Sequence, residues 1–127
     1  MKVDHISIGA KNTKSLADWY QNVLGIPVIL EMKRKGRLPV YFIKPKKGGH
    51  IEIQAHSTWN PHICFEVEDF WSTVKKLVDT GLTIRTVRKT SIGWLGCFFE
   101  DLEGNKIEIL YRKKPLPKSV ESFEKNG

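Results

Sequence analysis

Cysteines and long apolar segments are both scarce in this sequence. Its 127 residues include only two cysteines, Cys64 and Cys97, in no C-x-x-C spacing, which are too few for a disulfide scaffold. We expect both to be reduced and buried in strands. No apolar run approaches the roughly 20 residues of a membrane span, and no signal-peptide hydrophobic segment is present. We therefore expect a cytoplasmic protein with no membrane partner.

Acidic residues are outnumbered, because 14 Asp and Glu stand against 21 Lys and Arg, which gives a net charge of +7. A net positive charge is common among proteins that bind nucleic acid. The sequence has no recognition-helix, zinc-finger or RNA-binding signature, so we expect no nucleic-acid partner. Several basic residues gather at 33–37, 44–47 and 112–114. These clusters favour a solvated surface or the attraction of a small anionic molecule.

A repeat is the main positive feature of the chain. The pattern Gly-x-x-Ile-Glu-Ile occurs at 48–53 and again at 104–109. Each copy follows a His-Ile dipeptide at nearly the same distance, since Glu52 comes 47 residues after His5 and Glu108 comes 46 residues after His62. A repeat of this length predicts two copies of one structural unit. The repeated polar residues are two His and two Glu, which are good ligands for a divalent metal.

Hydrophobic periodicity predicts the same element order, βαβββ, in both copies. The predicted strands are 3–10, 28–33, 40–43 and 51–55 in the first copy, and 62–67, 82–88, 95–99 and 106–111 in the second. A helix follows the N-cap Asn12 or Thr13 and ends at Gly25, and another follows Asp69 and ends at Gly81. We expect one domain at 1–112, made of modules 1–56 and 57–112, and a basic tail at 113–127. Ser119–Lys125 is predicted to form a turn or two of helix.

Side-chain alternation predicts where the repeated residues point. On each strand the His or Glu faces away from the neighbouring isoleucines, which suit a face packed under a helix. The four polar side chains then share the concave face and form a ligand set with open positions, as a catalytic metal site requires. The predicted ligands are His5, Glu52, His62 and Glu108. We expect His50 and His56 to have surface or pocket-rim roles, because Lys106 and Arg112 occupy the equivalent positions in the other copy.

These residues resemble the vicinal oxygen chelate superfamily and, within it, glyoxalase I. Ser15–Gly25 looks like the first helix of the family, and Phe98–Ile109 is similar to its "F..D..G…E" ending. The resemblance covers about Lys2 to Arg112. It implies an α+β fold in which two tandem βαβββ modules form a U-shaped, partly closed mixed sheet around a central cavity. It also implies the same four ligands for a divalent Ni, Co, Zn or Mn ion, and a homodimer whose modules pair within one chain or across two.

The resemblance implies a metal-dependent lyase or isomerase. The metal would chelate two neighbouring substrate oxygens and stabilise an enediolate, while Glu108 or Glu52 transfers the proton. The His/Glu/His/Glu set matches glyoxalase I better than the His/His/Glu set of extradiol dioxygenases and of fosfomycin-resistance thiol transferases. Methylmalonyl-CoA epimerases carry Gln where this chain has Glu52. Another enzyme of the superfamily is one alternative. A metal-free binding protein similar to the bleomycin-resistance proteins is a second, which the intact ligand set and the positive charge disfavour.

Two departures from glutathione-dependent glyoxalases bear on the substrate. The connector between Glu52 and His62 is short, and the arginine expected near Gly9 for glutathione is absent. We therefore expect a small anionic or thiol-adduct substrate other than a glutathione adduct. The predicted substrate-binding residues are Ser7, Arg37 and Phe98.

Overall fold

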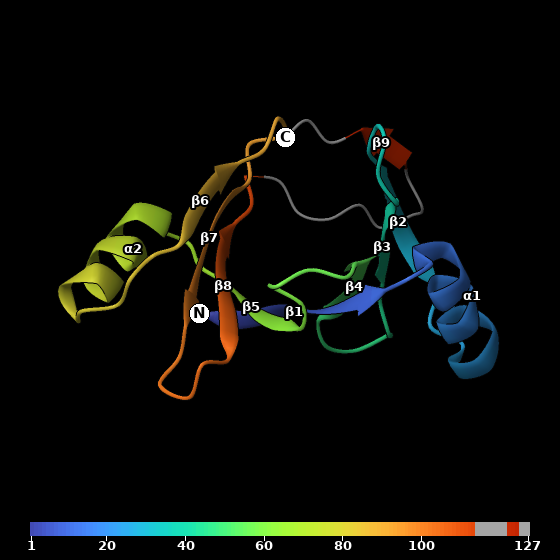
Figure 1. The fold of residues 1–127 in the computed structure, drawn as a ribbon, viewed down its shortest axis with the longest axis horizontal. Helices are drawn as coiled ribbons and strands as arrows, with labels where there is room; N and C mark the ends of the chain where they lie inside the picture. The colour runs from blue at the N-terminus through green and yellow to red at the C-terminus, as the bar shows by residue number, and fades with distance from the viewer. Residues whose placement is uncertain (114–121, 125–127) are drawn as a thin grey trace.

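The computed structural model describes residues 1–113 and 122–124 (Figure 1). The first module contains β1 (Lys2–Ala10), α1 (Thr13–Leu24), β2 (Val28–Lys33), β3 (Val40–Ile43) and β4 (His50–Ala55). The second contains β5 (His62–Glu66), α2 (Phe70–Asp79), β6 (Thr86–Lys89), β7 (Leu95–Glu100) and β8 (Lys106–Tyr111). A short strand, β9 (Ser122–Glu124), follows. The predicted βαβββ succession is therefore present twice.

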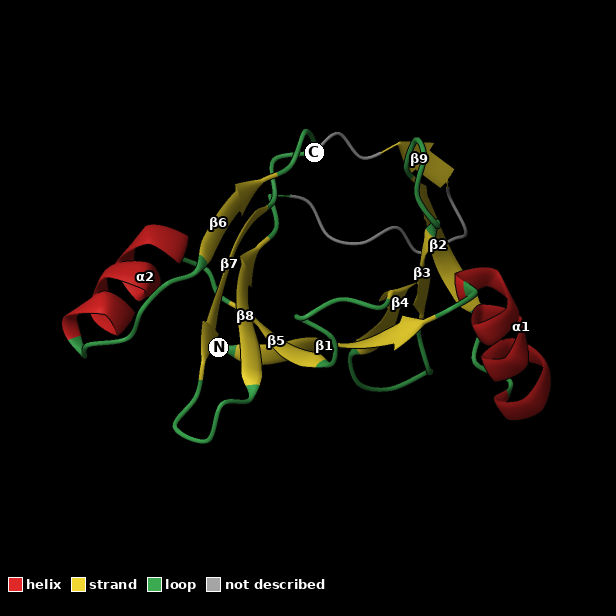
Figure 2. Cartoon of the chain, in the orientation of Figure 1, coloured by secondary structure: helices red, strands yellow, loops and turns green. Residues whose placement is uncertain are grey.

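All of these strands belong to one curled sheet, in the order β6-β7-β8-β5-β1-β4-β3-β2-β9. At its centre β1 and β5 pair antiparallel, and each has the last strand of its own module, β4 or β8, parallel on its other side. Figures 1 and 2 show β1 and β5 at the base of a U, with α1 and α2 outside its two arms. The predicted α+β fold with a U-shaped mixed sheet is confirmed. The two modules of one chain lie side by side, and a homodimer remains a prediction.

The helix boundaries follow from local hydrogen bonds. The side chain of Asn12 accepts a hydrogen bond from the Ser15 N–H at 2.9 Å, and Asp69 accepts one from the Ser72 N–H at 3.0 Å. Each cap satisfies a backbone donor that the first helical turn leaves without a partner. α1 ends where Gly25 adopts a left-handed conformation with φ 68°, which a glycine accepts without strain. Asp69 and, of the two candidates for the first helix, Asn12 are therefore confirmed as N-caps, whereas Thr13 is the first residue of α1.

Three apolar clusters hold the sheet and helices together. One lies beneath α1 and contains Ala10, Ala17, Tyr41, Ile43 and Ile53. Another lies beneath α2 and contains Val67, Phe70, Cys97, Phe99, Ile107 and Ile109. The third lies on the concave side and contains Leu30, Met32, Val40, Phe42, Cys64, Trp94 and Leu110. Both cysteines are buried and free, as predicted.

Two details of the sheet differ from the prediction. The strand expected at 82–88 begins only at Thr86, because Leu82 and Ile84 pack against the cluster beneath α2. The isoleucines beside the central histidines were expected to lie under a helix, but Ile6 is 47% exposed and Ile63 is 39% exposed. α1 packs mainly on β3 and β4, and α2 on β8, so neither helix buries Ile6 or Ile63.

The C-terminal tail adds a strand rather than a helix where it is described. β9 pairs parallel with β2, which places Phe123 opposite Met32 in register. The helix predicted over Ser119–Lys125 is therefore wrong for 122–124, where edge pairing supplies the backbone hydrogen bonds, and its other positions lie outside the described residues. Within 1–113 and 122–124, no helix is long and apolar enough to cross a membrane.

Candidate metal centre

The sheet topology brings the four predicted metal ligands together. His5 lies on β1, which pairs with the strand of Glu52, β4, and His62 lies on β5, which pairs with the strand of Glu108, β8. Because β1 and β5 are neighbours, the two pairs meet on the concave face. His5 Nε2 lies 3.0 Å from Glu52 Oε2 and 3.2 Å from Glu108 Oε1. The two histidine Nε2 atoms are 3.3 Å apart, and that of His62 lies 3.1 Å from Glu108 Oε1.

The ligand atoms form two overlapping groups that share His5, one with His62 and Glu108 and the other with His50 and Glu52, and the separations within each group suit a divalent ion. Metal bonds to imidazole nitrogen and carboxylate oxygen are roughly 2.0–2.2 Å long, so neighbouring ligand atoms around one ion stand about 3 Å apart. Two imidazoles and two carboxylates are a donor set that divalent first-row metals accept. The site is largely shielded from solvent, since the side chains of His5, His62, Glu108 and Glu52 are 1%, 4%, 10% and 12% exposed. The donor set therefore fits the divalent metal that the sequence predicted.

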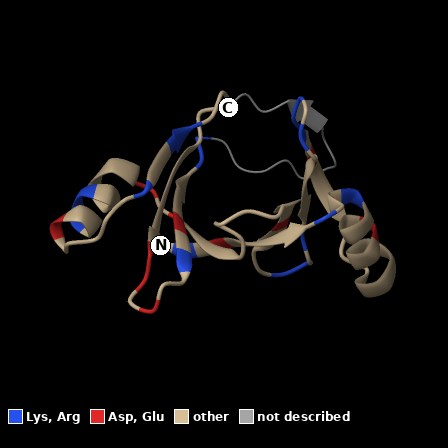
Figure 3. Ribbon diagram, viewed as in Figure 1, with Lys and Arg blue, Asp and Glu red and all other residues tan. Residues whose placement is uncertain are grey.

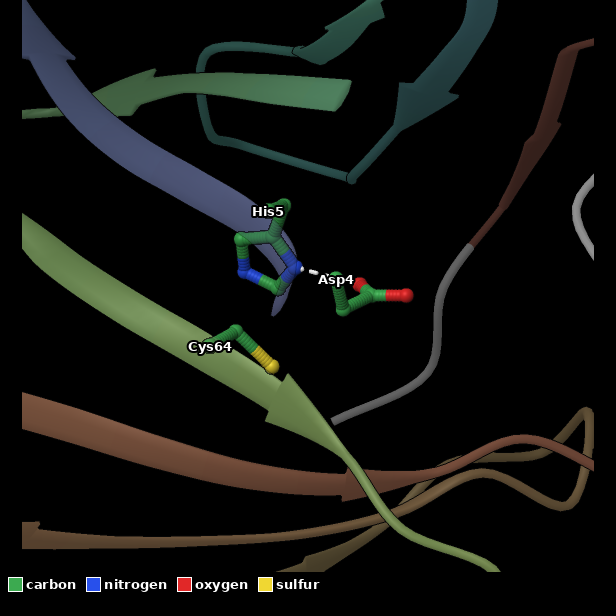
Figure 4. A group of neighbouring side chains, drawn as sticks. All are labelled: Asp4, His5 and Cys64. Carbon is green, nitrogen blue, oxygen red and sulfur yellow. Dashed lines mark hydrogen bonds and ion pairs between the residues drawn. The ribbon is translucent and has the colours of Figure 1, made fainter. Parts of the chain in front are cut away.

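A second layer of contacts orients both imidazoles. His5 Nδ1 lies 2.7 Å from Asp4 Oδ2 (Figure 4), and His62 Nδ1 lies 2.7 Å from the Trp59 carbonyl oxygen. With each Nδ1–H donating to these oxygens, both Nε2 lone pairs are directed at the site. Asp4 itself is held by an ion pair with Arg112. Sequence reasoning gave neither Asp4 nor Arg112 a role at the site.

Asp4, His5 and Cys64 form another group whose potential ligand atoms lie close together (Figure 4). Arg112 already neutralises the Asp4 carboxylate. Burial raises the pKa of the Cys64 thiol far above its ordinary value, and the charge of Glu108 raises it further, which makes the thiol a poorer ligand than the Glu52 and Glu108 carboxylates, whose pKa values are lowered. A metal ligand must be deprotonated. The His and Glu cluster is therefore the better cation site.

Without a metal, His5 supplies the positive charge that the carboxylates need. Burial alone would lower the pKa of His5, but Glu52, Asp4 and Glu108 together raise it to about 10. Burial would raise the pKa of Glu52, but His5 and His50 lower it to about 2. The pKa of Glu108 is likewise held well below its usual value by His5 and His62 against the effect of burial. A metal ion must therefore displace the proton from His5.

His50 is part of the site, which corrects the expected surface or rim role. The side chain is buried, and its ring stacks on Phe42 with centroids 4.7 Å apart. Its Nε2 lies 3.3 Å from Glu52 Oε2, and its ring centroid is 4.9 Å from that of His5. The symmetry argument excluded it because Lys106 stands at the equivalent position. Alternation alone would have found it, since it shares a face of β4 with Glu52. His56 is exposed, as predicted.

A cavity of about 60 Å³ adjoins the cluster, and His5, Glu52 and Glu108 form part of its wall. The three predicted substrate-binding residues are not part of that wall. Ser7 is fully buried and donates a hydrogen bond to the Asn60 side chain. Arg37 is exposed between β2 and β3, and Phe98 packs against His62 and Trp59. Their binding roles remain predictions. Three other arginines do line the cavity: Arg34, Arg88 and Arg112.

Replacing Asp4 with Asn should raise the metal dissociation constant of the protein by about 10- to 100-fold, the usual effect of losing an orienting carboxylate behind a metal-binding histidine. Competition with a chromophoric chelator would measure it. The matched control is Arg112→Met, which removes the Asp4 ion pair and leaves the carboxylate beside His5. We expect the control to lose stability in chemical denaturation but to keep most of its metal affinity. Equal losses of metal in the two variants would contradict an orienting role for Asp4.

Comparison with known proteins supports the fold and names the family. Residues 2–109 match the family model of the Glyoxalase/Bleomycin resistance protein/Dioxygenase superfamily. No curated protein sequence gives a significant match.

Among solved structures, the chain is similar to a variant of methylmalonyl-CoA epimerase from Streptomyces coelicolor, with TM-score 0.75 and 15% identity over 90% of this chain and 99% of that one. It is also similar to the methylmalonyl-CoA epimerase of Mycobacterium tuberculosis (TM-score 0.74, 16% identity, 89% of each chain). A hypothetical protein of Bacillus halodurans C-125 is comparable (TM-score 0.75, 15% identity, 90% and 96%). At this identity the likeness establishes the fold, and together with the family model over residues 2–109 it means that the chain belongs to the Glyoxalase/Bleomycin resistance protein/Dioxygenase superfamily.

Proposed function

We propose that this protein is a metal-dependent enzyme that moves a proton at a carbon next to a carbonyl group, as an isomerase, lyase or epimerase does. The observation that carries the proposal is the position of His5 Nε2, within 3.3 Å of ligand atoms from Glu52, Glu108 and His62. A binding protein without a metal would have no use for two buried carboxylates and two oriented imidazoles at one point, because burying charged groups is costly.

The four residues would hold the ion, which would polarise two neighbouring substrate oxygens and make the adjacent C–H more acidic. We assign the proton transfer to Glu108. Its Oε2 lies beside Gly96 of β7, where an added Cβ would stand 3.1 Å away, so the missing side chain leaves room for the carboxylate to reach substrate. The Oε1 of Glu52, by contrast, accepts a hydrogen bond from Gln54 at 2.9 Å, which favours a fixed ligand. The other oxygen of each glutamate faces His5.

Two reactions use this chemistry. In a glyoxalase-type isomerisation the proton moves to the neighbouring carbon, whereas in an epimerisation it returns to the same carbon from the other face. The glutamates fit either reaction, because Glu52 and Glu108 come from different modules and approach His5 from separate strands. The similarity in fold to methylmalonyl-CoA epimerases favours epimerisation as the second candidate. The glutamate at position 52 favours the isomerase.

The test combines metal analysis with proton exchange. Protein loaded in turn with Ni, Co, Zn and Mn should contain about one ion per chain. In D₂O it should then exchange the substrate C–H for deuterium in a metal-dependent way. Hemithioacetals of 2-oxoaldehydes with several thiols test isomerisation, and methylmalonyl-CoA tests epimerisation. A protein that takes up none of the four metals would refute the enzyme and favour the metal-free binding protein.

A further inference from the structure

We propose that Arg34 and Arg88 form a subsite for a carboxylate or phosphate group of the substrate, at a distance from the oxygens that the metal site holds. This inference rests on the proposed function and specifies its substrate class. Arg34 directly follows β2 on one arm of the U, and Arg88 lies in β6 on the other arm. Both line the cavity that also reaches His5, Glu52 and Glu108. Figure 3 shows Lys and Arg at the upper ends of both arms.

Among residues 1–113, the other charges around the cavity do not compensate these two arginines. A divalent ion would neutralise the carboxylates of Glu52 and Glu108. The third arginine of the cavity, Arg112, is already paired with Asp4. Within 1–113, neither Arg34 nor Arg88 has a carboxylate at ion-pair distance. The loaded site would therefore present about two positive charges to a substrate, which a phosphate or a second carboxylate group would offset.

The guanidinium of Arg34 has donor capacity to spare. Its Nη2 donates to the Leu38 carbonyl oxygen at 3.3 Å, while its Nε is buried without a hydrogen-bond partner among the described residues. Burial lowers the pKa of Arg34, and the charges of Arg37 and Arg88 lower it further. A buried donor without a partner is unfavourable. An oxyanion at this position would satisfy the donor and relieve the repulsion between the arginines.

Arg88 is held in place by an aromatic ring. Its guanidinium carbon lies 4.8 Å from the centroid of the Phe98 ring, a stacking that arginine favours and that leaves its N–H groups free in the plane. Thr90, two residues after Arg88, also lines the cavity. Phe98, predicted from the sequence to bind substrate, would on this account act by positioning Arg88.

The cavity connects the metal centre to the two arginines, because His5, Glu52, Glu108, Arg34 and Arg88 all line it. A substrate bound there would therefore reach from the metal centre to the arginines. The substrate class is therefore a small acid that has two adjacent oxygens at one end and a carboxylate or phosphate at the other. Glycerate, malate and 3-phosphoglycerate are suitable probes, because all three have the adjacent oxygens and only the last two add a remote anionic group.

Isothermal titration of the metal-loaded protein should give dissociation constants for malate or 3-phosphoglycerate at least tenfold lower than for glycerate. Arg34→Gln and Arg88→Gln should each remove most of that preference and leave the metal content unchanged. Lys89→Gln is the matched control, because it removes the same charge from the next residue of β6, which does not line the cavity. It should retain the preference. Preference for malate indicates a carboxylate subsite, and preference for 3-phosphoglycerate a phosphate subsite.

An equal affinity of wild type for all three probes would overturn the subsite, as would a preference that survives both arginine substitutions. Titration of the metal-free protein with inorganic phosphate separates this result from a failure of the proposed function. Phosphate binding that the arginine substitutions abolish would support the subsite even if no metal binds. If glycerate binds through the metal but inorganic phosphate does not bind to the metal-free protein, the proposed metal centre is supported and the anion subsite is overturned.

Discussion

A His5→Ala protein should bind none of the four divalent metals at micromolar concentration, and its metal-free form should be less stable than wild type by about 3 kcal/mol or more. His5 Nε2 is the central atom of the cluster, and it lies closer to Glu52, at 3.0 Å, than to any other ligand. Removing the imidazole takes away one metal ligand and also the cation that compensates two buried carboxylates. Both effects have the same cause, because the metal and the protonated His5 neutralise the same two carboxylates.

Metal content measured by elemental analysis and stability measured by urea denaturation in a chelating buffer would test this expectation. His56→Ala is the matched control, since it removes an exposed histidine outside the cluster, and it should leave metal content unchanged and stability within about 0.5 kcal/mol. A His5→Ala protein that keeps wild-type metal affinity would mean that the ion, if any, is held elsewhere. A loss of metal with no loss of stability would mean that the carboxylates are compensated without His5.

The order of the elements and the centre of the site could be predicted because the relevant signals are local and repeated, whereas the U shape of the sheet was implied by the family resemblance. Strand alternation fixes which face a side chain takes, and the repeat brings equivalent positions of two modules together around β1 and β5. That was sufficient to place His5 and Glu52 with His62 and Glu108. The same symmetry misled the assignment of His50, which the second module replaces with Lys106. A comparison of the two sequence repeats cannot find a functional residue that only one module carries.

Other features depend on contacts that no local pattern encodes. The ion pair of Asp4 and Arg112 joins residues 108 positions apart, so neither partner signals the other. The exposure of Ile6 follows from where the helices dock, since they cover the arms and not the base of the U. The three substrate-binding residues came from strand parity and charge clusters. Arg34 and Arg88 line the cavity because the sheet bends and turns its two arms toward each other. That bend had to be seen in the structure before the two arginines could be identified.

A Glu108→Gln protein loaded at saturating metal should lose at least about 100-fold in the rate of metal-dependent deuterium exchange, since a positioned general base contributes roughly 10²–10⁴-fold. The amide is isosteric with the carboxylate, and its oxygen can still face His5 and the ion. It cannot accept the substrate proton. The loss should therefore persist at saturating metal, when every site is filled. Single-turnover exchange monitored by mass spectrometry would measure the rate.

Glu52→Gln is the matched comparison, because it makes the same change in the other module. Glu52 is held by Gln54 and serves as a ligand in this scheme, so its substitution should weaken metal binding, and added metal should restore most of the exchange rate. The opposite pattern, with Glu108→Gln rescued by metal and Glu52→Gln not, would reassign the base to Glu52. Losses in both variants that metal does not restore would mean that each glutamate moves a proton, as an epimerase with one base on either side of the substrate carbon requires. The pair of variants therefore separates the two candidate reactions as well as the two roles.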